Sequence, residues 1–204
     1  MRAAKQLPLP LRQHGGRRPG AGRKPKGPRP LVSHKARALF DKPLPVHVTL
    51  RVGEDVWNLR SGRSYRRLKS SLAAAAGRFG LRVIAFSIQG NHLHFIVEAN
   101  DTEALSRGMQ GLCIRMAKAL NAMMRRSGRV FADHYHSRLL RSPSETVSAI
   151  AYVLDNHRHH HGEGGVDRYS SAALDDGERV KLLSRPVGWL LRVGWRRARW
   201  DTRQ

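Results

Sequence analysis

The hydrophobic pattern between residues 46 and 157 alternates between two periods, and this alternation limits the possible folds more than any other feature of the sequence. Apolar residues at every second position predict strands with one buried face, whereas apolar residues at every third or fourth position predict amphipathic helices. Seven such segments follow one another in the order β-α-β-β-α-β-α. The expected elements are strands at 46–52, 81–89, 92–98 and 137–141, and helices at 64–79, 100–126 and 142–157.

Residues that favour turns and helix starts agree with this order. Gly90-Asn91 supplies turn chemistry between the two middle strands, which predicts an antiparallel hairpin. Asn100 is placed to cap the second helix, and Ser142 followed by Pro143 is a well-formed start for the third. Two split β-α-β halves predict an α+β, ferredoxin-like sandwich, in which helices cover one face of an antiparallel sheet and the other face is open.

Positive charge is concentrated at the two ends of the chain. The 204 residues carry a formal net charge of +23. Residues 1–45 hold twelve Lys or Arg against one acidic residue, and residues 179–204 hold eight against one. We therefore expect a disordered basic arm at 1–43, a globular domain at 44–178 and a basic extension at 179–204. Such clustering favours a polyanionic partner, with nucleic acid ahead of an anionic membrane surface, although a solubility role is the simpler alternative.

The expected compartment follows from three further features. The single cysteine, Cys113, excludes an internal disulfide framework and suits a reducing environment, and its expected place near a helix core predicts an inert thiol. The Arg-rich start lacks the apolar segment of a secretory signal. No apolar run reaches the ~18 residues needed to span a bilayer. The expected location is therefore the cytoplasm, without membrane insertion.

Basic residues in the two flanks are candidates for nucleic-acid contacts. The arm holds short Gly- and Pro-flanked basic clusters that resemble AT-hook cores, although a general phosphate-binding arm fits equally well. In the extension, tryptophans lie among arginines, either as a helix packed on the domain or as a clamp that stacks on bases and binds phosphates. The candidates are Arg17, Arg18, Arg23 and Lys24 in the arm, and Arg196 and Arg197 in the extension.

His92 and His94 lie two residues apart on the third expected strand. Alternation places both imidazoles on one face, where they could converge on one divalent ion. Because the chain has 11 histidines, this spacing alone fits ordinary surface histidines equally well.

The last helix carries a second candidate element. Its expected apolar stripe puts Tyr152 and Asn156 together on the opposite side, four residues apart. The simple interpretation is a half-exposed tyrosine. Beside a histidine pair, however, a tyrosine can act as a nucleophile at phosphorus, and an amide oxygen can complete a metal shell. The expected stripe consists of Val147, Ile150, Ala151 and Leu154.

Three segments in this order resemble a known family. They are Asn91–Glu98 (NHLHFIVE), Gly128–Asp133 (GRVFAD) and Tyr152–Asn156 (YVLDN). The combination resembles the REP-associated tyrosine transposases, which are single-tyrosine HUH transposases of bacterial mobile elements. The resemblance covers about residues 44–160.

This resemblance implies a site and a reaction. His92 and His94 would hold a divalent metal, Mg²⁺ or Mn²⁺, and Tyr152 would cut hairpin-associated single-stranded DNA through a 5′-phosphotyrosine link. Asn156 would be the third ligand, at a position where relatives often carry Gln. The protein would act as a monomer or homodimer at the bacterial nucleoid.

Other polar residues near these segments are candidates for DNA contacts. His47 and Arg51 lie on the polar face of the first strand, with Thr49 between them. His134 and His136 flank a tyrosine in a loop, where DNA contact or turn packing is favoured over a second metal site. Glu98 shares the histidine face but lies ~13 Å farther along the strand, so we do not expect it to be a ligand.

The main alternative is a non-catalytic nucleic-acid-binding protein, either a domesticated relative that has lost cleavage or an RNA binder. An RRM has the same sheet architecture, but its aromatic signature is missing from these strands. His92, His94 and Tyr152 discriminate between the two classes, because a binder does not need all three on one side of the sheet.

Overall fold

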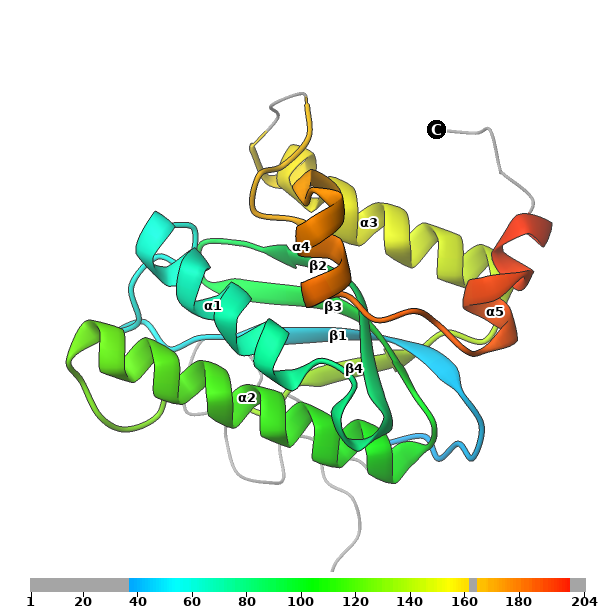
Figure 1. Cartoon of the computed structure of the whole chain (residues 1–204), viewed down its shortest axis with the longest axis horizontal. Coiled ribbons are helices and arrows are strands. Elements are labelled where there is room, and N and C mark those ends of the chain that lie inside the picture. The colour runs from blue at the N-terminus through cyan, green and yellow to red at the C-terminus, as the bar shows by residue number, and fades with distance from the viewer. Residues whose placement is uncertain (1–36, 162–164, 199–204) are drawn as a thin grey trace, which may run out of the picture. The chain divides into compact units, whose positions relative to one another are not determined.

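The computed structural model describes residues 37–161 and 165–198, without the side chains of 157–161. Arg17, Arg18, Arg23 and Lys24 therefore lie outside the described residues. The expected order of elements is observed (Figure 1). The principal elements are β1 (Leu44–Arg51), α1 (Gly62–Ala75), β2 (Leu81–Ile88), β3 (His92–Ala99), α2 (Thr102–Met124), β4 (His136–Leu139), α3 (Pro143–His161), α4 (Asp176–Leu182) and α5 (Trp189–Arg192), with 3₁₀ turns η1 (Arg78–Gly80), η2 (Ser171–Ala173) and η3 (Gly194–Arg197).

The four strands form one antiparallel sheet in the order β2-β3-β1-β4. The α+β class and the antiparallel sheet are thus confirmed. The two central strands, β1 and β3, pair along their whole length, with Thr49 opposite His94 and Arg51 opposite His92. This register matters for the site, because directly paired residues point to the same face of a sheet.

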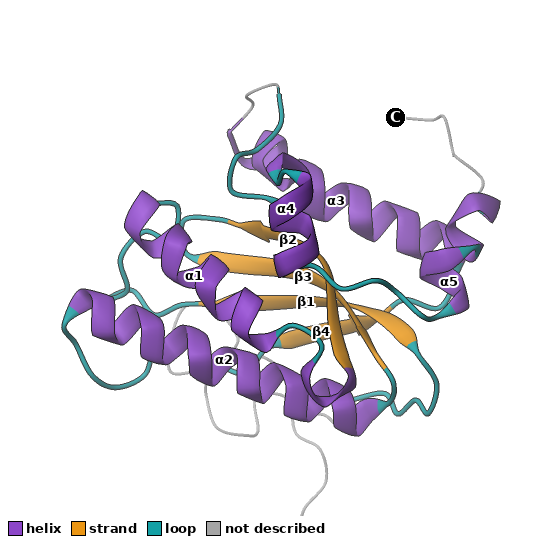
Figure 2. Cartoon of the chain, viewed as in Figure 1, coloured by secondary structure: helices purple, strands orange, loops and turns teal. Residues whose placement is uncertain are grey.

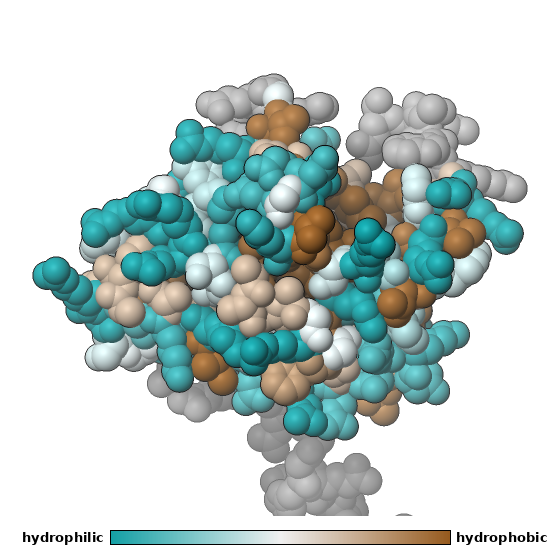
Figure 3. All heavy atoms as spheres, in the orientation of Figure 1, coloured by the Kyte–Doolittle hydropathy of each residue, from teal (hydrophilic) through white to brown (hydrophobic). Residues whose placement is uncertain are grey.

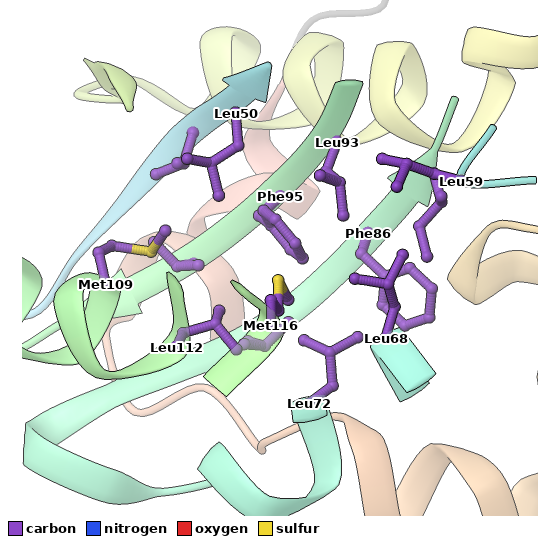
Figure 4. Packing of buried hydrophobic residues seen from close by; sticks show 14 of the residues in the cluster. Leu50, Leu59, Leu68, Leu72, Phe86, Leu93, Phe95, Met109, Leu112 and Met116 are labelled. Carbon is purple, nitrogen blue, oxygen red and sulfur yellow. The ribbon is translucent and has the colours of Figure 1, made fainter. Parts of the chain in front are cut away.

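The main core lies between the sheet and the pair α1 and α2 (Figure 4). Leu93, Phe95 and Val97 of β3 point into it and are completely buried. Helix α1 contributes Leu68 and Leu72, which lie one turn apart on its buried side. Alternate residues of β3 are therefore committed to packing, and the residues between them point to the other face.

The opposite face of the sheet is not fully open, which corrects the expectation that helices cover one face. Helix α3 packs there over a smaller apolar cluster that contains Ala85, Ile96 and Val153 (Figure 2). Strand β3 is buried from Leu93 to Ala99, although His94 and Glu98 are polar. Burial of successive residues means that both faces of the strand are covered, because successive side chains point to opposite faces.

Two helix boundaries also differ from the sequence expectation. Helix α1 ends at Ala75, and Phe79 lies in η1 with φ of 56° and a half-exposed ring, so it is not part of the helical stripe. Helix α2 is capped by Asp101, whose carboxylate accepts a hydrogen bond from the Ala104 N–H at 2.7 Å. The neighbouring Asn100 instead accepts a bond from Arg82 at 2.9 Å.

The described part of the C-terminal extension packs on the domain. The fully buried Glu98 carboxylate accepts hydrogen bonds from the backbone N–H groups of Val187 (2.7 Å) and Gly188 (2.8 Å). A Cβ at Gly188 would meet Glu98 Oε1 at 2.6 Å, so only glycine allows this approach. Leu190 and Leu191 are buried, and hydrophilic and hydrophobic side chains alternate at the surface around α5 (Figure 3). Leucines rather than tryptophans therefore anchor this segment.

Within the described ranges, no helix is both long enough and apolar enough to cross a membrane.

Candidate active site

His92 and His94 lie on the face of β3 that α3 covers. Their ring centroids are 4.9 Å apart, with the rings nearly perpendicular. His94 is almost completely buried, whereas His92 is partly exposed at the start of the strand. The shared face follows from strand alternation, because Leu93 between them points into the main core.

Tyr152 on α3 lies against this histidine pair. Its ring centroid is 5.5 Å from that of His94 and 5.8 Å from that of His47, with an edge-on arrangement in both cases. The side chain is 40 % exposed. Two imidazoles from β3, a third from β1 and a phenol from α3 therefore meet at one place that solvent can reach.

The other three tyrosines of the chain have different surroundings. Tyr65 and Tyr169 pack edge to face with centroids 5.1 Å apart, and burial raises the pKa of Tyr65 to about 12. Burial also raises the pKa of Tyr135, which lies beneath the Arg37 guanidinium. Because a raised pKa disfavours the phenolate, Tyr65 and Tyr135 are poorer nucleophiles than their residue type alone indicates.

Asn156 lies one turn beyond Tyr152, but its environment differs from the sequence expectation. It is completely buried, and neither its Oδ1 nor its Nδ2 has a hydrogen-bond partner among the described residues. The expected stripe of α3 was wrong in phase, because Ala151 is exposed and Val153 is buried. Asn156 therefore continues the buried side of the helix three residues after Val153.

His47 and Thr49 of β1 contact His94 directly. The His94 Nδ1 atom lies 3.1 Å from His47 Nε2 and 3.2 Å from Thr49 Oγ1. Burial, reinforced by the charges of His136 and Arg138, lowers the pKa of His47 to about 4. His47 is consequently neutral near pH 7, and its position against His94 and Tyr152 differs from that of an outward-facing contact to a DNA backbone.

The imidazole of His92 is contacted in a similar way. His92 Nδ1 lies 2.8 Å from the Asn91 side-chain oxygen. An amide oxygen only accepts hydrogen bonds, so this contact has the imidazole N–H as its donor. Each histidine of the pair is thus contacted at Nδ1.

The sequence interpretation missed Gln89. It is almost completely buried, its amide donates to the Ser87 hydroxyl at 2.8 Å, and its Oε1 has no hydrogen-bond partner among the described residues. Ser87 is directly opposite His94 in the sheet, and the Gln89 N–H donates to the His92 carbonyl. The available signal was a polar residue at the end of a largely apolar strand, just before the hairpin turn.

The part of this face formed by β1 and β4 carries exposed basic side chains. Arg51 is opposite His92, His136 is opposite Thr49, and Arg138 is opposite His47. All three side chains Arg51, His136 and Arg138 are exposed. We call them the basic row. Arg51 and His136 were candidates from the sequence, whereas Arg138 was not and is recognised only from the register of β4.

The remaining candidates lie apart from this cluster. His134 is exposed and contacts the adjacent Asp133 carboxylate at 3.2 Å. Arg196 and Arg197 lie in η3, where their guanidinium groups are 5.6 Å from the ring centroids of Trp195 and Trp189 respectively. Glu98 contacts the C-terminal backbone, as described above. Cys113 has a pKa raised to about 12 by burial, which agrees with an inert thiol.

Within the described residues, no group of three or more His, Cys, Asp and Glu side chains could hold a metal ion. Among the described side chains, a third protein ligand beside His92 and His94 would therefore be of another type. Asn156 offers a buried amide oxygen that lacks a hydrogen-bond partner, and it lies one turn from Tyr152 on the helix that packs on the histidine face.

Comparisons with known proteins identify the family. The family model described as "Transposase IS200 like" matches residues 45–155, which is more than half of the chain. The chain belongs to the IS200-like transposase family. Transposase-type processing of DNA is therefore its general function, and DNA is its partner.

A solved structure agrees with this fold. It is a REP-associated tyrosine transposase bound to a REP hairpin, with a TM-score of 0.60, 12 % identity and coverage of 77 % of this chain and 100 % of that chain. The chain also matches a putative transposase from Deinococcus radiodurans, with a TM-score of 0.43, 16 % identity and coverage of 61 % of this chain and 97 % of that chain, which is too low a score to support the fold. The comparison with curated proteins finds no match.

Proposed function

We propose that this IS200-like transposase cuts and rejoins single-stranded DNA beside hairpins, with Tyr152 as the nucleophile. The observation that carries the proposal is the convergence of Tyr152 of α3 with His92 and His94 of β3, since the His94 ring lies within contact distance of both other rings. Tyr152 is also exposed enough to reach a large substrate. A protein that only bound DNA would not need a phenol against two imidazoles.

The reaction exchanges one phosphate ester for another. The Tyr152 hydroxyl oxygen attacks the scissile phosphorus and loses its proton, while the bond from phosphorus to the 3′ oxygen breaks and that oxygen takes up a proton. The products are a 5′-phosphotyrosine and a free 3′-hydroxyl. The same hydroxyl, or one from another strand, can reverse the step, so joining needs no ATP.

A divalent ion, Mg²⁺ or Mn²⁺, fits the donor set. Two imidazoles and the Asn156 amide oxygen leave positions for water and phosphate oxygens, and such an ion would give the buried Asn156 oxygen the partner that it lacks. When bound, the ion would polarise the phosphate and stabilise the charge that develops on it. His92 and His94 would orient it beside the Tyr152 oxygen.

The basic row defined above supports a path for the DNA strand. Its exposed side chains lie on the same sheet face as His92 and His94, so a phosphate backbone that crosses β1 and β4 would arrive next to Tyr152. Arg196 and Arg197 beside two half-exposed tryptophans, together with the basic N-terminal arm and His134, would hold more distant parts of the same DNA.

One chain is enough to assemble this site. His92, His94 and Tyr152 meet within a single copy, which is compatible with a monomer as the catalytic unit, whereas a homodimer would serve to hold two DNA ends. Such an enzyme would work in the bacterial cytoplasm at the nucleoid.

The test is a covalent-adduct assay. A labelled hairpin with a single-stranded extension is incubated with the protein and Mn²⁺, and products are separated under denaturing conditions. The wild type should give a denaturation-resistant complex. Tyr152→Phe should give none but should still bind the hairpin, because the ring contacts remain. An adduct in Tyr152→Phe would rule out Tyr152 as the nucleophile, whereas tight binding without an adduct in the wild type would favour the non-catalytic alternative.

A further inference from the structure

The two imidazoles of the site are each contacted at the same ring atom. His94 Nδ1 lies within hydrogen-bond distance of His47 Nε2 (3.1 Å) and Thr49 Oγ1 (3.2 Å). His92 Nδ1 lies within that distance of the Asn91 amide oxygen (2.8 Å). Five residues from two strands and one turn therefore form three contacts at Nδ1 atoms.

The consequence concerns the position of a proton on each ring. A neutral imidazole has one N–H and one lone pair, and the partner of one nitrogen decides which form is present. If Nδ1 donates, the lone pair is on Nε2, which is the form needed for binding a metal through Nε2. If His47 instead donated to His94, the proton of His94 would lie on Nε2 and block that atom.

We infer that His47 and Thr49 are positioning residues that hold His94 as its Nδ1–H form, as Asn91 does for His92, so that both Nε2 atoms present a lone pair. The purpose of this arrangement rests on the proposed metal centre. The nitrogen that carries the proton on each ring, however, can be measured without a metal.

The geometry holds both partners of His94 in place beside its Nδ1 atom. Thr49 is the direct sheet partner of His94, so its hydroxyl is held on the same face at a fixed register. The ring stacking of His47 on His94, with centroids 5.3 Å apart, fixes the plane of both rings. The edge contact of His47 with Tyr152 adds a second function, because movement of His47 would displace the nucleophile as well.

The decisive measurement uses the metal-free full chain with ¹⁵N-labelled histidine. Long-range ¹H–¹⁵N correlation spectra at a pH where the rings are neutral report which nitrogen carries the proton. The wild type should show both His92 and His94 as Nδ1–H forms. A wild-type His94 that carries its proton on Nε2 would overturn the inference without any variant.

Variants separate positioning from simple packing. His47→Phe combined with Thr49→Val keeps the bulk but removes both partners, so His94 should move toward the Nε2–H form while His92 stays unchanged. Asn91→Ala should move His92 toward the Nε2–H form while His94 stays unchanged. His47→Gln and Thr49→Ser, which keep an acceptor, should retain the wild-type form of His94. A double variant in which His94 keeps its wild-type form would overturn the inference, and Thr49→Val alone tests it if the double variant does not fold.

A second readout is Mn²⁺ affinity, measured by electron paramagnetic resonance. Loss of a hydrogen-bond partner behind a metal-bound histidine weakens binding about 10- to 100-fold, and the double variant should fall in that range. If the wild type binds no Mn²⁺ but shows the Nδ1–H forms, the proposed metal centre fails and the positioning role stands. If it binds Mn²⁺ with His94 as the Nε2–H form, only the positioning role fails.

Discussion

The two faces of the sheet show how one small domain combines stability with chemistry. On the face covered by α1 and α2, strand residues such as Phe95 pack into a continuous apolar core. On the face covered by α3, a small cluster around Val153 and Ile96 is followed by polar side chains, including the buried amide of Asn156, which has no hydrogen-bond partner among the described residues. The face covered by α1 and α2 buries few polar groups, whereas the face covered by α3 buries several, and for Asn156 we propose a chemical use.

The largest expected effect is on the apolar face. Phe95→Ala should lower the free energy of unfolding by about 3–5 kcal/mol, because it removes a fully buried ring. Urea unfolding followed by circular dichroism measures the loss. Well below its unfolding temperature the variant should still form the DNA adduct, since Phe95 points away from the histidine face. Loss of the adduct in a folded Phe95→Ala protein would contradict the assignment of packing to one face and DNA chemistry to the other.

The matched change on the other face should behave in the opposite way. Asn156→Leu removes a buried amide whose missing hydrogen bonds cost about 1–3 kcal/mol, so the free energy of unfolding should stay constant or rise. Mn²⁺ affinity and adduct formation should both fall. Val153→Ala, three residues earlier, is the control and should cost about 1.5 kcal/mol of stability with no change in Mn²⁺ affinity. An Asn156→Leu protein with wild-type Mn²⁺ affinity would remove Asn156 from the proposed ligands.

A pH dependence should also distinguish the two faces. The pKa of His47 is lowered from 6.5 to about 4, so the unfolded chain binds a proton at this residue between these values while the folded protein does not. The contribution of neutral His47 to the free energy of unfolding is complete above pH 6.5. This free energy should fall as the pH decreases from 6.5 to about 4. Urea midpoints across this window should fall less in His47→Gln than in the wild type, with the exposed His134→Gln as control. Equal slopes in His47→Gln and the wild type would contradict the cause given for the shift.

The smallest expected effect concerns surface charge. Arg138 on the histidine face and Arg107 on α2 are both exposed and paired with a glutamate, at 3.2 and 3.3 Å. Arg138→Gln should reduce the slope of log affinity against log salt for single-stranded DNA by about 0.7 if one phosphate contact is lost. Arg107→Gln should leave the slope unchanged. Fluorescence anisotropy over a salt series measures both, and equal slopes for the two variants would remove β4 from the proposed strand path.

The same contrast explains what the sequence could and could not predict. The order of elements and the shared face of His92 and His94 follow from local periodicity, which a short window of sequence contains. The phase of α3 does not, because hydrophobicity cannot recognise a buried Asn156 or an exposed Ala151. Apolar patterns therefore predicted the face covered by α1 and α2 better than the face covered by α3.

Contacts across the sheet could not be predicted either. The meeting of His47 and Thr49 with His94 depends on the register of β1 against β3, a long-range pairing that the spacing of residues does not encode. The end of α1 was misjudged for a local reason: Gly77 and Gly80 adopt positive φ values of 68° and 70°, which end the helix before Phe79 despite its favourable spacing. Gln89 was overlooked because a single polar residue at a strand end has many uses.

The central claim is that Tyr152, rather than any other tyrosine, becomes linked to DNA. After reaction with a hairpin substrate and Mn²⁺, the protein is digested with nuclease and protease, and the nucleotide-bearing peptide is identified by mass spectrometry. The account predicts one modified peptide, with the phosphate on Tyr152. A nucleotide on Tyr65, Tyr135 or Tyr169, with Tyr152 unmodified, would contradict it.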